Sequence, residues 1–343
     1  MARIVDVAQR AGVAPSVVSR LLNGDPTLRI RPETKSRVLA AAEELDYAPN
    51  HAARALRRSS VGALGMAVHD LHNPVYGEII AGAEAAARAQ GCVLMLADVD
   101  SLASDDDTFR RVVSGGAIDG LMLQRDGYAS DQVVARVAGA RVPVVILNER
   151  VRAPLSGIAV DDRRAAALAT GHLIALGHTE IAHLGAGGKN SRARDRQAGW
   201  RDAMTKAGLD PRRDLVRVGG VRPESGYKAL MELLAAARPP TAVFAASLLA
   251  AVGALTAARA AGIPVPDDLS IVGFHDAWFA EHVHPSLTVV RLPLREMGRR
   301  AVLLLGERAA GAPPQQVLVT EPEPEVVPRG STAPPRSRAL RPS

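Results

Sequence analysis

The sequence contains a single cysteine, Cys92, among its 343 residues, so it can form neither an internal disulfide nor a metal site built from several cysteines. Residues 1–25 lack the basic start and apolar core of a secretory signal peptide. Residues 239–258 carry no charge, but they are mostly alanine with Pro, Ser, Thr and Gly, and they divide into a strand and a helix rather than one membrane span. We therefore expect a cytoplasmic protein without a membrane partner.

Signatures of catalysis are also missing. There is no Gly-x-Ser-x-Gly nucleophile elbow, and the glycine-rich residues 185–189 lack the spacing and the Ser or Thr after lysine that a phosphate loop requires. Metal-ligating residue types gather near one another at His275, Asp276, Glu281, His282 and His284. Because they follow a predicted strand, a solvated polar loop is favoured over a metal site. The sequence predicts neither an enzyme nor a cofactor.

Positive charge is concentrated at the two ends of the chain. Residues 1–60 contain ten Lys and Arg against six Asp and Glu, and residues 331–343 contain three Arg and no acid. The long middle, 61–330, is nearly neutral, with 29 basic and 30 acidic residues. This distribution favours a small polyanion-binding module attached to a neutral body.

Two short amphipathic helices joined by a tight turn are predicted between residues 6 and 24. Apolar residues recur at helical spacing at Val7, Ala8, Ala11, Val17, Val18, Leu21 and Leu22. Gly12 supplies the backbone freedom of the turn. The outer side of the second helix carries polar groups that suit a DNA major groove, but an ordinary helical hairpin packed on a core has the same pattern.

Residues 3–58 as a whole resemble the DNA-binding headpiece of the LacI family of bacterial repressors. The motifs that carry the resemblance are Asp6-Val7-Ala8, Ala11-Gly12-Val13, Val18-Ser19-Arg20, Leu22-Asn23-Gly24, Tyr47 and Pro49-Asn50. The resemblance implies a double-stranded DNA operator as partner, with headpiece contacts at Pro15, Ser16, Ser19, Arg20, Asn23 and Thr34. Arg20 and Ser16 would read base edges, Ser19 and Thr34 would hold phosphates, and Pro15 offers only apolar contact.

Residues 49–60 are predicted to be a hinge. A helix of about ten residues is marginal by itself in water. The resemblance implies that it folds on the operator, pairs across a homodimer and inserts Leu56 into the minor groove, flanked by Asn50, Ala53 and Arg54. An inert linker remains the alternative.

From residue 61 onwards, apolar strand-like runs alternate with helical patterns, which predicts parallel sheets covered by helices. Two successive sets predict two doubly wound subdomains, with a ligand bound outside the carboxyl ends of the strands. This resembles the periplasmic-binding-protein-like effector domain of the same family. The predicted divisions are a helix-turn-helix headpiece (1–48), the hinge (49–60), an effector-binding and dimerisation domain (61–330) and a disordered tail (331–343). Within the effector domain we expect one subdomain from about 61–160 plus 290–320 and another from about 161–289 plus 321–330.

The resemblance implies a small-molecule effector, with a carbohydrate as the expected class. The matching positions are Asp70, Val75, Tyr76, Asp161, Arg196, Val221, Ser247 and His275. Tyr76 would stack on the effector or simply pack in the core, and Arg196 would grip a diol or carboxylate unless it is a surface arginine. Ser247 and His275 replace the asparagine and aspartate that the family often has, which puts a common neutral sugar in doubt.

The favoured function is a ligand-controlled, homodimeric transcriptional repressor that binds a palindromic operator. The alternative is a solute-binding protein of the periplasmic type without a DNA function. Residues 3–58 favour the repressor, because an exported binding protein has no use for a headpiece. The sequence does not distinguish an inducer from a corepressor.

Overall fold

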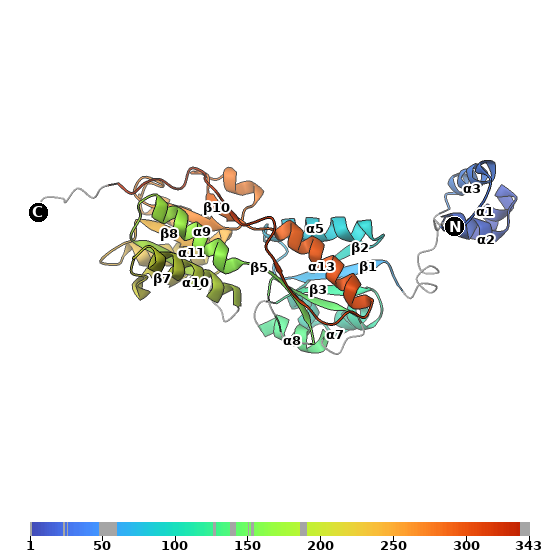
Figure 1. Ribbon diagram of the computed structural model, residues 1–343, viewed down its shortest axis with the longest axis horizontal. Coiled ribbons are helices and arrows are strands. Elements are labelled where there is room, and N and C mark those ends of the chain that lie inside the picture. Colours follow the sequence, from blue (N-terminus) through green and yellow to red (C-terminus); the bar gives the residue numbers. More distant parts are fainter. Residues whose placement is uncertain are drawn as a thin grey trace, which may run out of the picture. The chain divides into compact units, whose positions relative to one another are not determined.

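A computed structural model describes residues 2–22, 25, 27–47, 60–125, 128–137, 142–149, 151, 154–185 and 191–336 (Figure 1). The chain divides into two compact units, Met1–Val61 and Gly62–Ser343. Five predicted DNA contacts lie outside the described residues, namely Asn23, Asn50, Ala53, Arg54 and Leu56. The helical hinge therefore stays a prediction.

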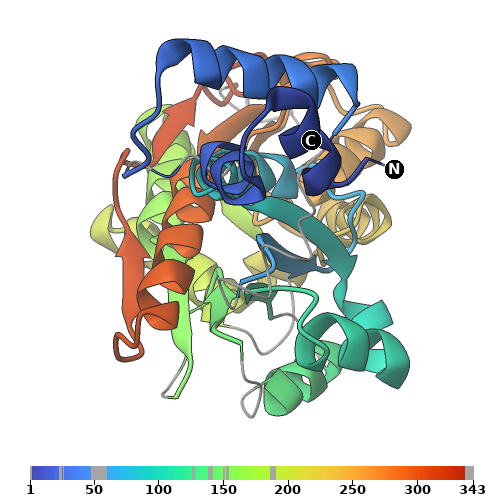
Figure 2. The same ribbon diagram turned by 90° about the vertical axis from the view of Figure 1, so that its right-hand side faces the viewer.

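The described part of the first unit contains three packed helices, α1 (Ile4–Ala11), α2 (Pro15–Leu22) and α3 (Pro32–Glu44), drawn in blue in Figures 1 and 2. Gly12 ends α1 with a φ of 64°, the left-handed conformation that favours glycine. The helices enclose a small core of Val7, Ala8, Ala11, Val18, Val38, Ala41 and Ala42. The predicted helix–turn–helix is confirmed, with proline in the first position of α2 and α3, where a missing N–H costs no helical hydrogen bond.

The second unit contains two six-stranded sheets (Figure 1). The first has the order β11-β5-β4-β3-β1-β2. Its strands are β1 (Ala63–Val68), β2 (Val93–Asp98), β3 (Gly120–Gln124), β4 (Val144–Leu147), β5 (Ser156–Val160) and β11 (Gln316–Val319). All its neighbouring strands are parallel. Their carboxyl ends therefore share one edge of the sheet.

The second sheet has the order β12-β10-β9-β8-β6-β7. Its strands are β6 (Ile181–Gly185), β7 (Val216–Val218), β8 (Ala242–Ala245), β9 (Ser270–Phe274), β10 (Thr288–Arg291) and β12 (Glu325–Val327). Only β12 runs antiparallel to its neighbour. The predicted pair of doubly wound parallel subdomains is thus confirmed, and the chain passes between the sheets after β5, β10 and β11.

The helices that cover the two sheets include three pairs that meet at glycines. The covering helices are α5 (Tyr76–Ala89), α6 (Val99–Ser104), α7 (Asp106–Phe109), α8 (Tyr128–Val137), α9 (Asp162–Ala175), α10 (Ser191–Lys206), α11 (Pro223–Leu234), α12 (Leu248–Ala260) and α13 (Leu294–Ala309). A Cβ on Gly82 would overlap the Arg295 carbonyl where α5 meets α13, and Gly199 and Gly253 stand equally close to a neighbouring helix backbone. Within the described residues, no helix is long and apolar enough to span a membrane.

The outermost strand β2 corrects the expectation that every apolar strand is covered on both faces. Val93 is 63% exposed, and Met95 and Leu96 are also exposed. Cys92 lies just before β2 and is half-buried, and burial raises the pKa of its thiol. The single chain therefore presents an apolar edge strand, a surface that can pair with another chain.

The predicted disordered tail is wrong for its first six residues. Ser331 is fully buried; its hydroxyl donates to the Ile271 carbonyl (2.6 Å) and accepts from the Thr288 amide (2.9 Å). The Ala333 amide donates to the Ser270 hydroxyl (3.0 Å). These bonds fasten the segment after β12 to β9 and β10, and residues 337–343 lie outside the described part.

His178 makes this attachment sensitive to pH. Its Nε2 lies 2.9 Å from the Ala333 carbonyl, which can only accept, so Nε2 carries the proton and Nδ1 accepts from the Thr241 hydroxyl (2.9 Å). Burial lowers the pKa of His178 from the ordinary value of 6.5. The neutral imidazole therefore contributes stability above pH 6.5, and that stability is lost as the pH falls toward the lower pKa of the folded state.

We expect the wild-type melting temperature to fall when the pH is lowered from about one unit above the ordinary histidine pKa of 6.5 to about one unit below it. The His178→Gln variant keeps one donor and one acceptor but does not titrate, so its melting temperature should fall less. His282→Gln, at an exposed position, is the control. An equal acid-induced loss in wild type and His178→Gln would contradict this assignment.

Candidate DNA-binding and effector sites

The outer face of α2 carries the predicted DNA-contact residues. Val18 is fully buried against α1 and α3, which directs Pro15, Ser16 and Arg20 outward, and all three are exposed. Ser19 is half-buried on the same helix, and Thr34 is half-buried in the first turn of α3. The geometry thus gives α2 an exposed, polar face with one arginine, of the kind that enters a major groove.

Arg20 is held by the segment that leads from α2 to α3. Its Nε donates to Asp25 Oδ2 (2.7 Å) and its Nη2 donates to Thr27 Oγ1 (2.9 Å). Hydrogen bonds from the Thr27 hydroxyl and from Arg20 lower the pKa of Asp25 to about 2. The carboxylate therefore stays charged at neutral pH beside the guanidinium.

Arg196, which the sequence predicts to bind an effector, is buried in the second subdomain and contacts several of its elements. It is 5% exposed. Its Nε donates to Asp162 Oδ1 (2.7 Å), at the start of α9, and its Nη1 donates to the Ala246 carbonyl (2.6 Å), just after β8. Its guanidinium also lies 4.1 Å from the centre of the Phe274 ring. Three elements are joined by one side chain whose charge is already compensated.

His275 completes this group. It follows β9 with a φ of 74°, is buried, and its Nε2 lies 3.4 Å from Arg196 Nη2. Because the guanidinium can only donate, His275 Nε2 accepts and the imidazole is neutral. Burial and the nearby charge of Arg196 lower the pKa of His275 well below the ordinary value. His275 therefore presents a neutral side chain where the family often has an aspartate.

The other predicted effector residues have varied surroundings. Tyr76 is buried in the apolar core beside Val75, at the start of α5. Asp161 caps α9 by accepting from the Arg164 amide (2.9 Å). The Ser247 hydroxyl donates to the carbonyl of Val221 (3.2 Å), whose own side chain is exposed.

Two contacts bring the edges of the two sheets together. Asp70, with a φ of 53°, lies 3.6 Å from the Arg222 guanidinium. Arg192 donates to the Arg125 carbonyl at 3.4 Å. Asp70 and Arg125 follow β1 and β3 of the first sheet, whereas Arg192 and Arg222 belong to the second subdomain. The carboxyl ends of the two sheets therefore face each other.

Sequence reasoning missed three polar residues at the carboxyl edge of the first sheet. His69, Gln124 and Asn148 follow or end β1, β3 and β4, which are neighbours in that sheet. The side-chain Oε1 of Gln124 accepts from the backbone amide of His69 (3.3 Å), while His69 Nε2 and Asn148 Oδ1 are buried with no hydrogen-bond partner among the described residues. A polar residue at the end of each apolar run is the signal that could have found them.

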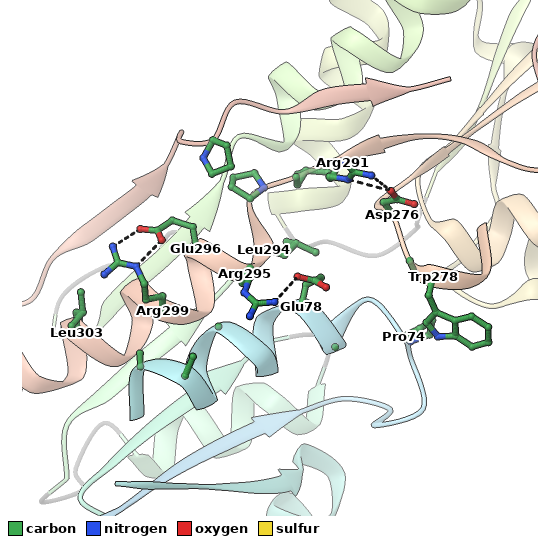
Figure 3. A pocket seen from close by; sticks show the side chains of 18 of the residues that line it. Pro74, Glu78, Asp276, Trp278, Arg291, Leu294, Arg295, Glu296, Arg299 and Leu303 are labelled. Carbon is green, nitrogen blue, oxygen red and sulfur yellow. Dashed lines mark hydrogen bonds and ion pairs between the residues drawn. The ribbon is translucent and has the colours of Figure 1, made fainter. Parts of the chain in front are cut away.

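A separate cavity of about 1020 Å³ lies between α5, α13 and the loop after β9 (Figure 3). None of the eight predicted effector residues lines it. Most of its charged residues pair with one another, as Figure 3 shows for Arg291 with Asp276 (2.7 Å) and Arg299 with Glu296 (2.6 Å). Within the part of the chain that the structure describes, no group of three or more His, Cys, Asp or Glu residues is placed to hold a metal ion.

Comparisons with known proteins bear on both sites. The family model described as bacterial regulatory proteins, lacI family, matches residues 3–50, and a periplasmic binding protein-like domain matches residues 170–332. The transcriptional regulator DegA of Bacillus subtilis is 32% identical over 334 residues, covering 96% of this chain and 98% of DegA. The chain belongs to the lacI family.

Solved structures of related regulators span nearly the whole chain. The Lac repressor dimer bound to operator and the anti-inducer ONPF is 26% identical, with a TM-score of 0.78, and covers 97% of this chain and 99% of that one. The regulator CelR in complex with cellobiose is 29% identical, with a TM-score of 0.69, and covers 96% and 100%. This lacI-family protein is accordingly a DNA-binding transcriptional regulator and not an enzyme.

Proposed function

We propose that this regulator binds, as a homodimer, an operator with twofold symmetry and represses transcription there. The observation that carries the proposal is the exposed face of α2, where Pro15, Ser16 and Arg20 project from a helix–turn–helix. Ser19 and Thr34 would hold phosphates beside it, and Asn23 and the hinge residues Asn50, Ala53, Arg54 and Leu56 are proposed as further DNA contacts. A solute-binding protein without DNA function would leave this headpiece unexplained.

Two observations support a homodimer. The edge strand β2 exposes Val93, Met95 and Leu96, apolar groups that a second copy would remove from water. The related Lac repressor is a dimer on its operator. Because a symmetric dimer places two equivalent headpieces on DNA, the operator should be an inverted repeat.

We further propose that a small, uncharged, sugar-like effector binds between the carboxyl ends of the two sheets. The ionic groups buried there are paired, as Arg196 is with Asp162, and His275 is neutral. His69 Nε2 and Asn148 Oδ1 offer buried hydrogen-bonding atoms to a polar ligand. Cellobiose in the related CelR is a ligand of this class. We place Asp70, Val75, Tyr76, Asp161, Val221 and Ser247 around the same site.

Selection of bound sequences from a random DNA pool tests the proposal. We expect an inverted-repeat consensus. Arg20→Ala should weaken specific binding by roughly 1–3 kcal/mol and relax one base position in each half-site, because a base-reading contact is lost. Lys35→Ala, at an exposed position on α3, is a charge-matched control that should leave the consensus unchanged. A consensus without symmetry, or an unchanged consensus for Arg20→Ala, would contradict it.

A further inference from the structure

Asp25 and Thr27, which lie between α2 and α3, form a closed ring of hydrogen bonds with Arg20. The Arg20 guanidinium donates to Asp25 Oδ2 and to Thr27 Oγ1, and the Thr27 hydroxyl in turn donates to Asp25 Oδ1 (2.7 Å). The Thr27 amide donates to the same carboxylate oxygen (2.8 Å). The Asp25 amide donates to the Arg20 carbonyl (3.0 Å), which ties the segment to the last turns of α2. The ring therefore restrains an exposed arginine that would otherwise sample many rotamers.

The ring engages only one edge of the guanidinium. Arg20 uses its Nε–H and one Nη2–H toward Asp25 and Thr27, so both Nη1–H groups and the second Nη2–H have no partner among the described residues. A guanidinium has five donors in a rigid fork, and its two terminal nitrogens can donate together to O6 and N7 of guanine. The arrangement thus leaves available the edge that makes a bidentate contact with a base.

Asp25 has opposite effects on specific and non-specific binding. A carboxylate near the DNA backbone is repelled by every phosphate and offsets the positive charge of Arg20, which weakens binding to all sequences alike. Restraint of the guanidinium lowers the entropy lost when the arginine makes its base contact, and this gain applies only where the matching base is present. Together these effects raise discrimination more than affinity.

We propose that Asp25 and Thr27 are positioning residues, which hold the Arg20 guanidinium so that its terminal edge reads a guanine in each operator half-site. This inference rests on the proposed function of α2 as the DNA-reading helix. It gives the segment between α2 and α3 a role in specificity without direct contact between Asp25 and a base.

The test measures the dissociation constants of full-length variants for three DNA duplexes. These are the selected operator, the operator with the Arg20-dependent guanine replaced in both half-sites, and a duplex of unrelated sequence. For Asp25→Asn we expect discrimination between the first two duplexes to fall by about tenfold, because the restraint on Arg20 is weakened. Affinity for the unrelated duplex should rise several-fold, because a negative charge is removed.

Three further variants separate positioning from charge. Thr27→Val keeps the charge and removes the hydroxyl, so discrimination should fall while non-specific affinity is unchanged. Thr27→Ser restores the hydroxyl and should restore discrimination. Glu43→Gln removes an acid from the exposed side of α3 and should leave discrimination at wild-type level. Circular dichroism of each variant checks that the headpiece is folded.

Several results would overturn the proposal. If Asp25→Asn tightened operator binding without loss of discrimination, the carboxylate would be competing with DNA for Arg20. Unchanged discrimination in both Asp25→Asn and Thr27→Val, or selection of a base other than guanine at the Arg20-dependent position, would also contradict it. Failure of the underlying function is distinguishable, because Arg20→Ala would then relax no base position.

Discussion

Replacement of Arg196 by alanine is expected to destabilise the effector domain by about 3–5 kcal/mol, because it leaves a buried carboxylate without its partner. The Arg196 and Asp162 side chains are 6% and 3% exposed and lie 2.7 Å apart. The substitution also removes the donor to the Ala246 carbonyl and the cation over the Phe274 ring. Urea unfolding of wild type and variant measures the loss.

Arg201→Ala is the matched control, because Arg201 lies on the same helix α10 and is exposed. Its effect should stay within about 0.5 kcal/mol. A double variant, Arg196→Met with Asp162→Leu, removes both charges together and should lose less stability than Arg196→Ala. If Arg196→Ala cost no more than Arg201→Ala, the buried pair would not stabilise this subdomain.

The expected loss of stability in Arg196→Ala complicates the use of this variant to test the effector site. If Arg196 grips the effector, as the sequence predicts, Arg196→Ala should abolish the effector response and leave the DNA affinity of the ligand-free protein largely unchanged. According to the structure, the same substitution also destabilises the effector domain. A destabilised domain responds poorly to an effector even when no ligand contact has been removed. The response of the double variant, measured where it is fully folded, separates a ligand contact from a structural one.

Replacement of Gly82 by alanine is expected to destabilise the first subdomain by about 3 kcal/mol or more, because the helices must separate to accommodate one methyl group. A Cβ at Gly82 overlaps the carbonyl oxygen of Arg295, a backbone atom that cannot move aside alone. Gly298 on α13 makes the reciprocal close approach to the backbone of α5, at Ile79. Thermal and urea unfolding measure the effect.

Gly77→Ala, in the same helix, is expected to have the opposite effect on the free energy of unfolding. No atom lies within 4 Å of a Cβ built at Gly77, so the substitution meets no obstacle. Alanine favours the helix over glycine by up to about 1 kcal/mol, and Gly77→Ala should be neutral or stabilising. If both substitutions were equally neutral or stabilising, helix propensity and not the close approach of α5 and α13 would govern this site.

Local elements of this protein followed from its sequence, since they depend on neighbouring residues. The apolar spacing of Val7, Ala11 and Val18, with Gly12 between them, predicted the two helices and the turn that the structure contains. The alternation of apolar runs with helical patterns predicted the parallel sheets that the structure contains. Each of these patterns has a period set by backbone geometry, which a single segment reveals.

Other features were decided only by the tertiary structure. The sequence predicts that Arg196 contacts the effector, and only the fold shows that its guanidinium also pairs with Asp162 and lies beside His275, residues distant in sequence. β2 has the same apolar character as buried strands, and only its position at the end of the sheet leaves Val93 exposed. The segment after residue 330 looked disordered because its order comes from hydrogen bonds to β9, β10 and His178.

The physical reason is the same in each case. Periodicity and turn preference are properties of adjacent residues, whereas charge compensation, edge exposure and hydrogen bonding depend on which distant segments the topology brings together. In the headpiece, the sequence alone determined that Arg20 projects from the second helix. Only the folded structure shows Asp25 and Thr27 hydrogen-bonded to its guanidinium, because the sequence does not reveal which side chains meet there.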